Sequence, residues 1–138
     1  MSESPSARRF TLEEATRALE QVRPLAEAMV AAGRALAEAT ERQTGLSHRI
    51  AGNGGGMSPG ELAGAQTELG QAVGAVAEAV DALHELGVLV KDVERGLVDF
   101  PARRGDEDVL LCWHVGEDEI GYWHGFDEGF AGRKRLPF

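Results

Sequence analysis

Residues 87–102 read Gly-Val-Leu-Val-Lys-Asp-Val-Glu-Arg-Gly-Leu-Val-Asp-Phe-Pro-Ala, and residues 109–115 read Val-Leu-Leu-Cys-Trp-His-Val. Both segments are short, rich in β-branched and aromatic residues, and bounded by glycine or charged residues, which is the pattern of β-strands. They follow an alanine-rich region with helical spacing that makes up the first two thirds of the chain. The pattern predicts a small, mostly antiparallel β-sheet with an irregular C-terminal tail, and we expect strands at 88–93, 97–102, 109–115 and 120–126.

The third of these segments indicates which face of the sheet is buried. Side chains alternate along a strand, so Val109, Leu111 and Trp113 share one face. Cys112 and His114 share the other. We expect the face with Trp113 to pack against the helices.

Two long helices are expected before the sheet, because each has a clear start. Thr11 and Glu14 form a capping box, and Ser58 and Glu61 form another. Apolar or small residues then recur at alternating steps of three and four, the period of a helix that packs along a partner.

Proline and glycine residues are expected to bend, end or connect these elements. The first helix should kink at Pro24 and end near Thr44, and residues 51–57 should form a flexible glycine linker. Gly87 should end the second helix as a left-handed cap. Pro101 cannot donate to a ladder, so it should end its strand or lie on an edge.

These elements predict one α+β domain over residues 10–138, preceded by a disordered N-terminus at 1–9. An antiparallel two-helix hairpin is expected over 10–86, and the β unit over 87–138. Two helices cannot enclose a core alone, so either the sheet or a second copy of the hairpin must cover the open seam. We therefore expect a homo-oligomer, most simply a dimer.

Charge and cysteine usage restrict the partners and the compartment. The net charge is −9, with 23 Asp and Glu against 14 Lys and Arg. Such a field repels nucleic acid and anionic membranes, and no apolar run is long enough to span a bilayer. A single cysteine excludes a disulfide scaffold, and the N-terminus lacks a signal-peptide core. We expect a cytoplasmic protein with a protein partner or a small anionic ligand.

The C-terminal motifs resemble a known family. Gly-Val-Leu-Val-Lys-Asp with Gly-Leu-Val-Asp-Phe-Pro, Leu-Cys-Trp with Gly-Glu-Asp-Glu-Ile, and Trp-His with Gly-Phe-Ala-Gly-Arg are similar to the uncharacterised bacterial domain of unknown function 2203. The resemblance implies a small bacterial cytoplasmic protein without an assigned activity. The residues that match the family pattern are Lys91, Asp92, Asp99, Cys112, Trp113, Glu117, Trp123, His124 and Arg133. His114 departs from it.

A divalent metal is the only cofactor that the residues suggest, although none is strongly implied. His114, Glu117 and His124 are the candidate ligands, with Cys112 as a further donor nearby. The two histidines meet only if the last two strands pair around a turn centred near Glu119. No established metal motif such as His-Glu-x-x-His supports the site.

A small-ligand pocket is the broader hypothesis, in which Arg133 suits a carboxylate or a phosphate. Its candidate residues are Lys91, Asp92, Asp99, Trp113, Trp123, His124 and Arg133. The same charged groups could instead form ion pairs that tie the sheet together. Cys112 could act as a nucleophile with His114 as its base, but a cysteine inside a strand is more often a buried, inert thiol.

The sequence therefore favours a non-enzymatic, self-associating interaction module. The alternative is a small metal- or metabolite-binding protein, or an enzyme, with its site around His124.

Overall fold

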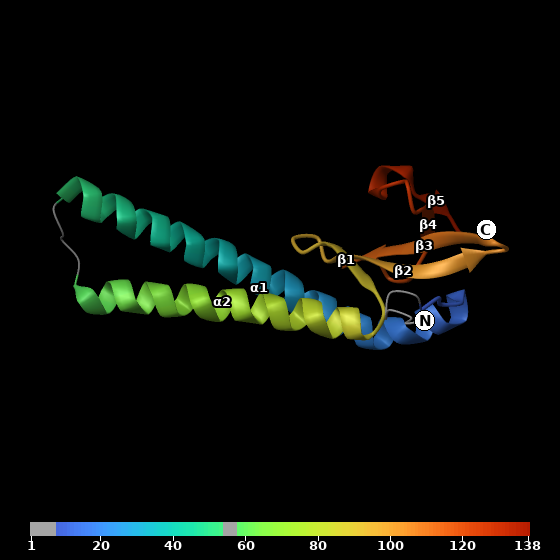
Figure 1. The fold of residues 1–138 in the computed structure, drawn as a ribbon, viewed down its shortest axis with the longest axis horizontal. Helices are drawn as coiled ribbons and strands as arrows, with labels where there is room; N and C mark the ends of the chain where they lie inside the picture. Colours follow the sequence, from blue (N-terminus) through green and yellow to red (C-terminus); the bar gives the residue numbers. More distant parts are fainter. Residues whose placement is uncertain (1–7, 54–57) are drawn as a thin grey trace, which may run out of the picture.

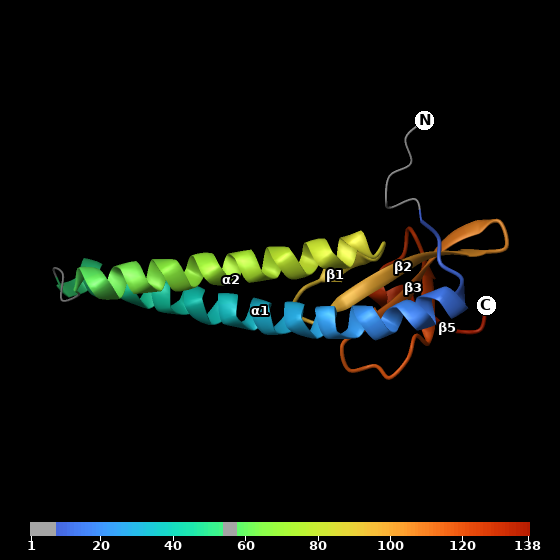
Figure 2. The same cartoon turned by 90° about the horizontal axis from the view of Figure 1, so that it is seen from below.

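Two long helices followed by a sheet form the α+β fold that the sequence predicts. The computed structural model describes residues 8–53 and 58–138. Helix α1 (Leu12–Asn53) and helix α2 (Pro59–Glu85) run antiparallel and side by side (Figures 1 and 2). The sheet lies beside the half of the hairpin where the chain enters α1 and leaves α2. The other half of the hairpin extends beyond the sheet (Figure 1).

The capping box at the start of α1 is confirmed, but the predicted end of the helix is wrong. Glu14 N donates to Thr11 Oγ1 at 3.0 Å, and Thr11 N donates to Glu14 Oε1 at 2.9 Å. The helix continues through Pro24 and past Thr44 to Asn53. One glycine inside a helix costs only about 1 kcal/mol relative to alanine, which packing along α2 can offset.

The predicted glycine linker therefore does not begin at residue 51. Its residues 51–53 are the last residues of α1, and residues 54–57 lie outside the described part of the chain. Residues 1–7 of the predicted disordered N-terminus also lie outside it. Helix α2 begins as predicted, with Ser58 as the N-cap.

Five antiparallel strands follow in sequence order: β1 (Leu89–Asp92), β2 (Leu97–Arg104), β3 (Glu107–His114), β4 (Tyr122–Gly125) and β5 (Lys134–Arg135). The four predicted strands are present, although β4 is shorter than the predicted 120–126. The fifth strand was not predicted, since two residues carry no readable period. Between β4 and β5 lies a single 3-10 turn, η2 (Phe130–Gly132).

Pro101 does not end β2, which continues to Arg104. Strand β1 pairs with β2 only as far as Asp99, so Pro101 has no β1 residue beside it. The Pro101 carbonyl instead accepts a hydrogen bond from Phe10 N at 2.7 Å. The missing N–H therefore costs no ladder bond to β1. Because β2 lies between β1 and β3 and Phe10 bridges Ala102, the expectation that Pro101 ends its strand or lies on an edge is wrong.

The main core lies between the sheet and α1, as the alternation of 109–115 predicted. Trp113 and Phe100 from the sheet are fully buried in the same cluster as Val22 and Met29 from α1. At the turn between β1 and β2, Gly96 has a φ of +65°.

Neither helix of the described chain is long and apolar enough to cross a membrane.

Candidate functional site

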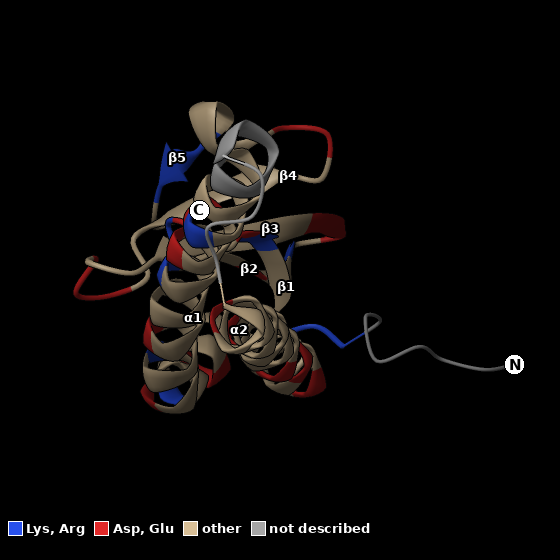
Figure 3. Cartoon of the chain, turned by 90° about the vertical axis from the view of Figure 1, so that its left-hand side faces the viewer, with Lys and Arg blue, Asp and Glu red and all other residues tan. Residues whose placement is uncertain are grey.

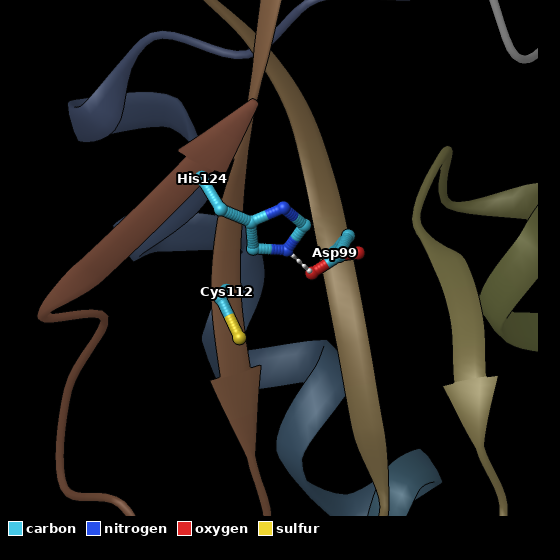
Figure 4. Close-up of side chains that lie close together, drawn as sticks. All are labelled: Asp99, Cys112 and His124. Atoms are coloured by element: carbon cyan, nitrogen blue, oxygen red, sulfur yellow. Dashed lines mark hydrogen bonds and ion pairs between the residues drawn. The ribbon is translucent and has the colours of Figure 1, made fainter. Parts of the chain in front are cut away.

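A cluster of buried polar side chains lies on the sheet face opposite Trp113. Asp99 on β2, Cys112 on β3 and His124 on β4 come from three neighbouring strands (Figure 4). Asp99 pairs with Cys112 across the β2–β3 ladder. The exposed fractions of Asp99, Cys112 and His124 are 1%, 0% and 3%.

Both ring nitrogens of His124 face oxygen atoms. Nδ1 lies 2.9 Å from the carbonyl oxygen of Gly125, and Nε2 lies 3.2 Å from Oδ1 of Asp99. A carbonyl oxygen only accepts, so Nδ1 must carry the proton of the first hydrogen bond. In the neutral ring Nε2 then has a lone pair, which points at a carboxylate that also only accepts. A proton or another cation must lie between Nε2 and Oδ1 to stabilise this contact.

Burial dominates the ionisation of the other two groups. It raises the pKa of the Asp99 carboxyl, and the neighbouring His124 acts in the opposite direction. Burial, together with the charge of Asp99, raises the pKa of the Cys112 thiol to about 11, although a hydrogen bond from Arg133 lowers it. Cys112 is therefore a thiol at neutral pH.

The hypothesis of a Cys112 nucleophile finds no base in this geometry. Both nitrogens of His124 already face Asp99 and Gly125. His114, the base suggested by the sequence, has its Nδ1 2.8 Å from the carbonyl oxygen of Val115. A buried thiol without a base is a poor nucleophile.

The structure separates the two histidines that the sequence proposed as metal ligands. In the β3–β4 ladder His124 pairs with Leu110, whereas His114 pairs with Leu97 in the β2–β3 ladder. Four residues along a strand correspond to about 13 Å. His124 is therefore far from His114 and meets Asp99 and Cys112 instead.

The other two predicted ligands form a neighbouring ion-pair group. Arg133 Nη1 lies 3.1 Å from Oε2 of Glu117, and His114 Nε2 lies 3.8 Å from the same oxygen. The guanidinium of Arg133 also stacks on the rings of Tyr122 and Phe130, 3.9 and 4.2 Å from their centroids. These contacts hold the segment around η2 against the sheet. Arg133 therefore has the structural role that the sequence offered as the alternative to ligand binding.

The remaining candidate ligand residues do not converge on His124. Asp92 Oδ1 accepts from Glu94 N at 2.9 Å and so stabilises the turn after β1. Trp113 and Trp123 belong to the main core on the opposite face. Lys91 is exposed on β1 but lies close enough to lower the pKa of Asp99.

Only Asp99 and His124 of the predicted pocket thus share the buried cluster. Its third member, Cys112, is one of the metal donors that the sequence suggests, but the sequence does not place it beside Asp99. The signal available was the alternation in 109–115, which places Cys112 on the face opposite Trp113. The partner strand and its register could not be read from that signal.

A second feature lies on the half of the hairpin that extends beyond the sheet. Leu62, Leu69, Val73 and Val76 recur at helical spacing and share one flank of α2. The first, second and fourth are half-buried, and Val73 is 51% exposed. Where this flank meets the sheet, an apolar groove of about 370 Å³ is lined by Val30, Gly33, Leu36, Ala37, Val76 and Val93, with Arg34 and Glu94.

Comparison with known proteins identifies a family that covers nearly the whole chain. The family described as an uncharacterized conserved protein, DUF2203, matches residues 8–136. No match was found among the curated proteins or among the solved structures. The resemblance drawn from the C-terminal motifs is confirmed, and the chain belongs to the DUF2203 family.

Proposed function

We propose that this protein is a self-associating module of the bacterial cytoplasm, in which the extended half of the hairpin packs against that of a second copy. The observation that carries the proposal is the apolar flank of α2. One residue of this flank, Val76, also lines the groove to which Val93 of the β unit contributes. Along the extended half, the buried residues whose side chains the structure describes are alanines: Ala39, Ala65 and Ala72. The larger aliphatic side chains remain partly in water, and a second hairpin would bury them.

The distribution of charge along α2 permits a second copy to pack on this flank. The protein has a net charge of −9, and α2 contains acidic residues but no Lys or Arg (Figure 3). Between Glu68 and Glu78, however, α2 has no charged residue. Two acidic chains can therefore meet at this segment without placing carboxylates against each other. A two-fold axis near Val73 would lay one apolar flank on the other, the geometry of an isologous dimer.

The metabolite-binding alternative has less support from the geometry. Asp99, Cys112 and His124 are at most 3% exposed, so a small anion cannot contact them without movement of the strands. Arg133, the group expected to bind an anion, is already paired with Glu117. A cytoplasmic setting agrees with the free, buried Cys112 thiol.

The test is the molar mass of the full chain in solution as a function of concentration, measured by sedimentation equilibrium. We expect a dimer that dissociates on dilution. Val73→Glu should weaken association at least about tenfold, because it buries a charge at the contact. Gln71→Glu adds the same charge about 160° around the helix from Val73, on the opposite face of α2, and should leave the dimer unchanged.

Two outcomes would contradict the proposal. One is a monomer at every concentration up to the millimolar range. The other is a dimer that Val73→Glu leaves intact, which would move the contact to another surface. Circular dichroism of each variant separates loss of association from loss of folding.

A further inference from the structure

The contact between His124 and Asp99 brings a ring nitrogen and a carboxyl oxygen together in a buried site, where a proton or another cation must lie between them. His124 Nδ1 is committed to the carbonyl oxygen of Gly125, so the lone pair of Nε2 points at Asp99 Oδ1, 3.2 Å away. Two buried acceptors at this distance repel each other unless a positive centre lies beside both. The Cys112 sulfur is close by, because the three donor atoms all lie within 4.8 Å of one another.

We propose that Asp99, Cys112 and His124 bind a divalent transition-metal ion, with zinc the best match. Thiolate sulfur, imidazole nitrogen and carboxylate oxygen are the three donor types that zinc uses in proteins. No other group of three or more His, Cys, Asp and Glu side chains within reach of one ion occurs in the described part of the chain. The site therefore differs from the set His114, Glu117 and His124 that the sequence suggested.

The hydrogen bond of His124 to Gly125 is the kind that orients a metal-binding histidine. Ligating imidazoles usually donate their second N–H to a carbonyl or a carboxylate, which fixes the tautomer and the ring plane. Here Nδ1 makes that bond, and Nε2 is the nitrogen left to bind the ion.

The distances require only a small contraction. Bonds of 2.0–2.3 Å to a tetrahedral zinc place its ligand atoms about 3.3–3.8 Å apart. Relative to the 4.8 Å limit, the donor atoms must approach by about 1 Å, which small side-chain rotations can supply. Because each donor comes from a different strand, the ion would cross-link β2, β3 and β4. Three protein donors leave the fourth tetrahedral position to a small ligand such as water.

Cobalt(II) is the probe that tests this site, because it replaces zinc and reports its ligands. The full chain is stripped with chelator, and Co²⁺ is added while the absorption spectrum is recorded. We expect one ion per chain, the visible bands of tetrahedral cobalt, and a near-ultraviolet sulfur-to-cobalt charge-transfer band. Cys112→Ser should remove the charge-transfer band. His124→Gln should weaken binding at least about 100-fold, the upper end of what loss of an outer-shell partner costs.

His114→Gln is the matched control, because His114 lies on β3 two residues from Cys112 but outside the cluster. It should leave the spectrum and the affinity unchanged. The proposal is overturned if no ion binds, if the charge-transfer band survives in Cys112→Ser, or if His114→Gln weakens binding as much as His124→Gln does. It is also overturned if several ions bind weakly, as they do on exposed carboxylates.

A measurement on the unaltered chain keeps the test independent of whether the variants fold. X-ray absorption at the zinc edge of the zinc-loaded protein should show one sulfur neighbour among nitrogen and oxygen neighbours. A spectrum without sulfur would refute the assignment of Cys112. If the stripped protein takes up no ion, the positive centre between Nε2 and Oδ1 is a proton.

Discussion

Gly96 and Val115 lie so close together that a β-carbon on Gly96 would collide with the Val115 side chain. The same β-carbon would lie 2.9 Å from Cγ2 of Val30 on α1, and Gly96 has a φ of +65°. This position joins the turn after β1 to both the sheet and the helix. It therefore requires glycine for two reasons, space and backbone conformation.

We predict that Gly96→Ala lowers the free energy of unfolding by about 1–3 kcal/mol, the cost of a non-glycine residue in a strained backbone position. Urea denaturation followed by tryptophan fluorescence measures it. Gly74→Ala is the control, because Gly74 lies in α2 with open space around the position of a β-carbon. That change should stabilise by up to about 1 kcal/mol. Equal effects of the two substitutions would contradict the structure.

Asp99→Ala is predicted to destabilise the chelator-treated protein strongly. The substitution leaves His124 buried with Nε2 facing a cavity, and removing one partner of a buried pair costs about 3–5 kcal/mol. Asp81→Ala, on the exposed surface of α2, is the control and should change stability by less than about 0.5 kcal/mol. Denaturant titration of both variants provides the comparison. A loss below about 1 kcal/mol for Asp99→Ala would show that the pair is not buried as described.

The Cys112 thiol is predicted to be protected from alkylation and disulfide exchange in the native, metal-free protein. It is fully buried, and its pKa is raised to about 11, so it is neither accessible nor ionised at pH 8. An aromatic disulfide reagent should react only as fast as the protein opens, and immediately in concentrated urea. Rapid stoichiometric reaction of the native protein would contradict this burial.

Asp108 should make the protein less stable as the pH falls. Arg9 and Arg103 hold the pKa of this carboxyl below its usual value through ion pairs of 3.0 and 3.3 Å. Because the folded pKa is lower than the unfolded one, the contribution is present above the unfolded pKa of about 3.9. It is lost as the pH falls from there through the folded pKa. The Asp108 carboxyl is exposed, so the effect on stability is small.

The ¹³C chemical shift of the Asp108 carboxyl gives a direct titration. Its midpoint should lie below that of the same residue in the urea-unfolded chain. A midpoint at or above the unfolded value would contradict the two ion pairs. Arg9→Gln should move the midpoint upward, because the larger of the two charge-assisted contacts is lost.

Much of the fold could be predicted because the signals for it are local. The capping boxes at Thr11 and Ser58 involve residues three positions apart, and both helices begin where predicted. The alternation around Trp113 likewise identified the buried face, since side chains of successive strand residues must point to opposite sides.

The buried cluster could not be predicted because it depends on register between strands. The segment after β3 does not make a tight hairpin; Arg23 of α1 holds it by donating to the carbonyl oxygens of Glu117 and Asp118 at 3.1 and 2.7 Å. That distant contact accompanies a register in which His124 lies beside Leu110 rather than His114. The end of α1 also depends on a contact between segments distant in sequence. Packing along α2 outweighs the cost of Gly45 inside the helix, so α1 continues to Asn53.

The order of the strands also has a consequence for the rate of folding. Each strand pairs with its neighbour in the chain, so the strand pairings close short loops. Such local pairings favour fast folding. The contacts that close long loops are those of the first part of the chain with the sheet, including the hydrogen bond from Phe10 to Pro101. Docking of this segment closes the longest loop and so costs the most chain entropy. It also joins the helical hairpin to the sheet.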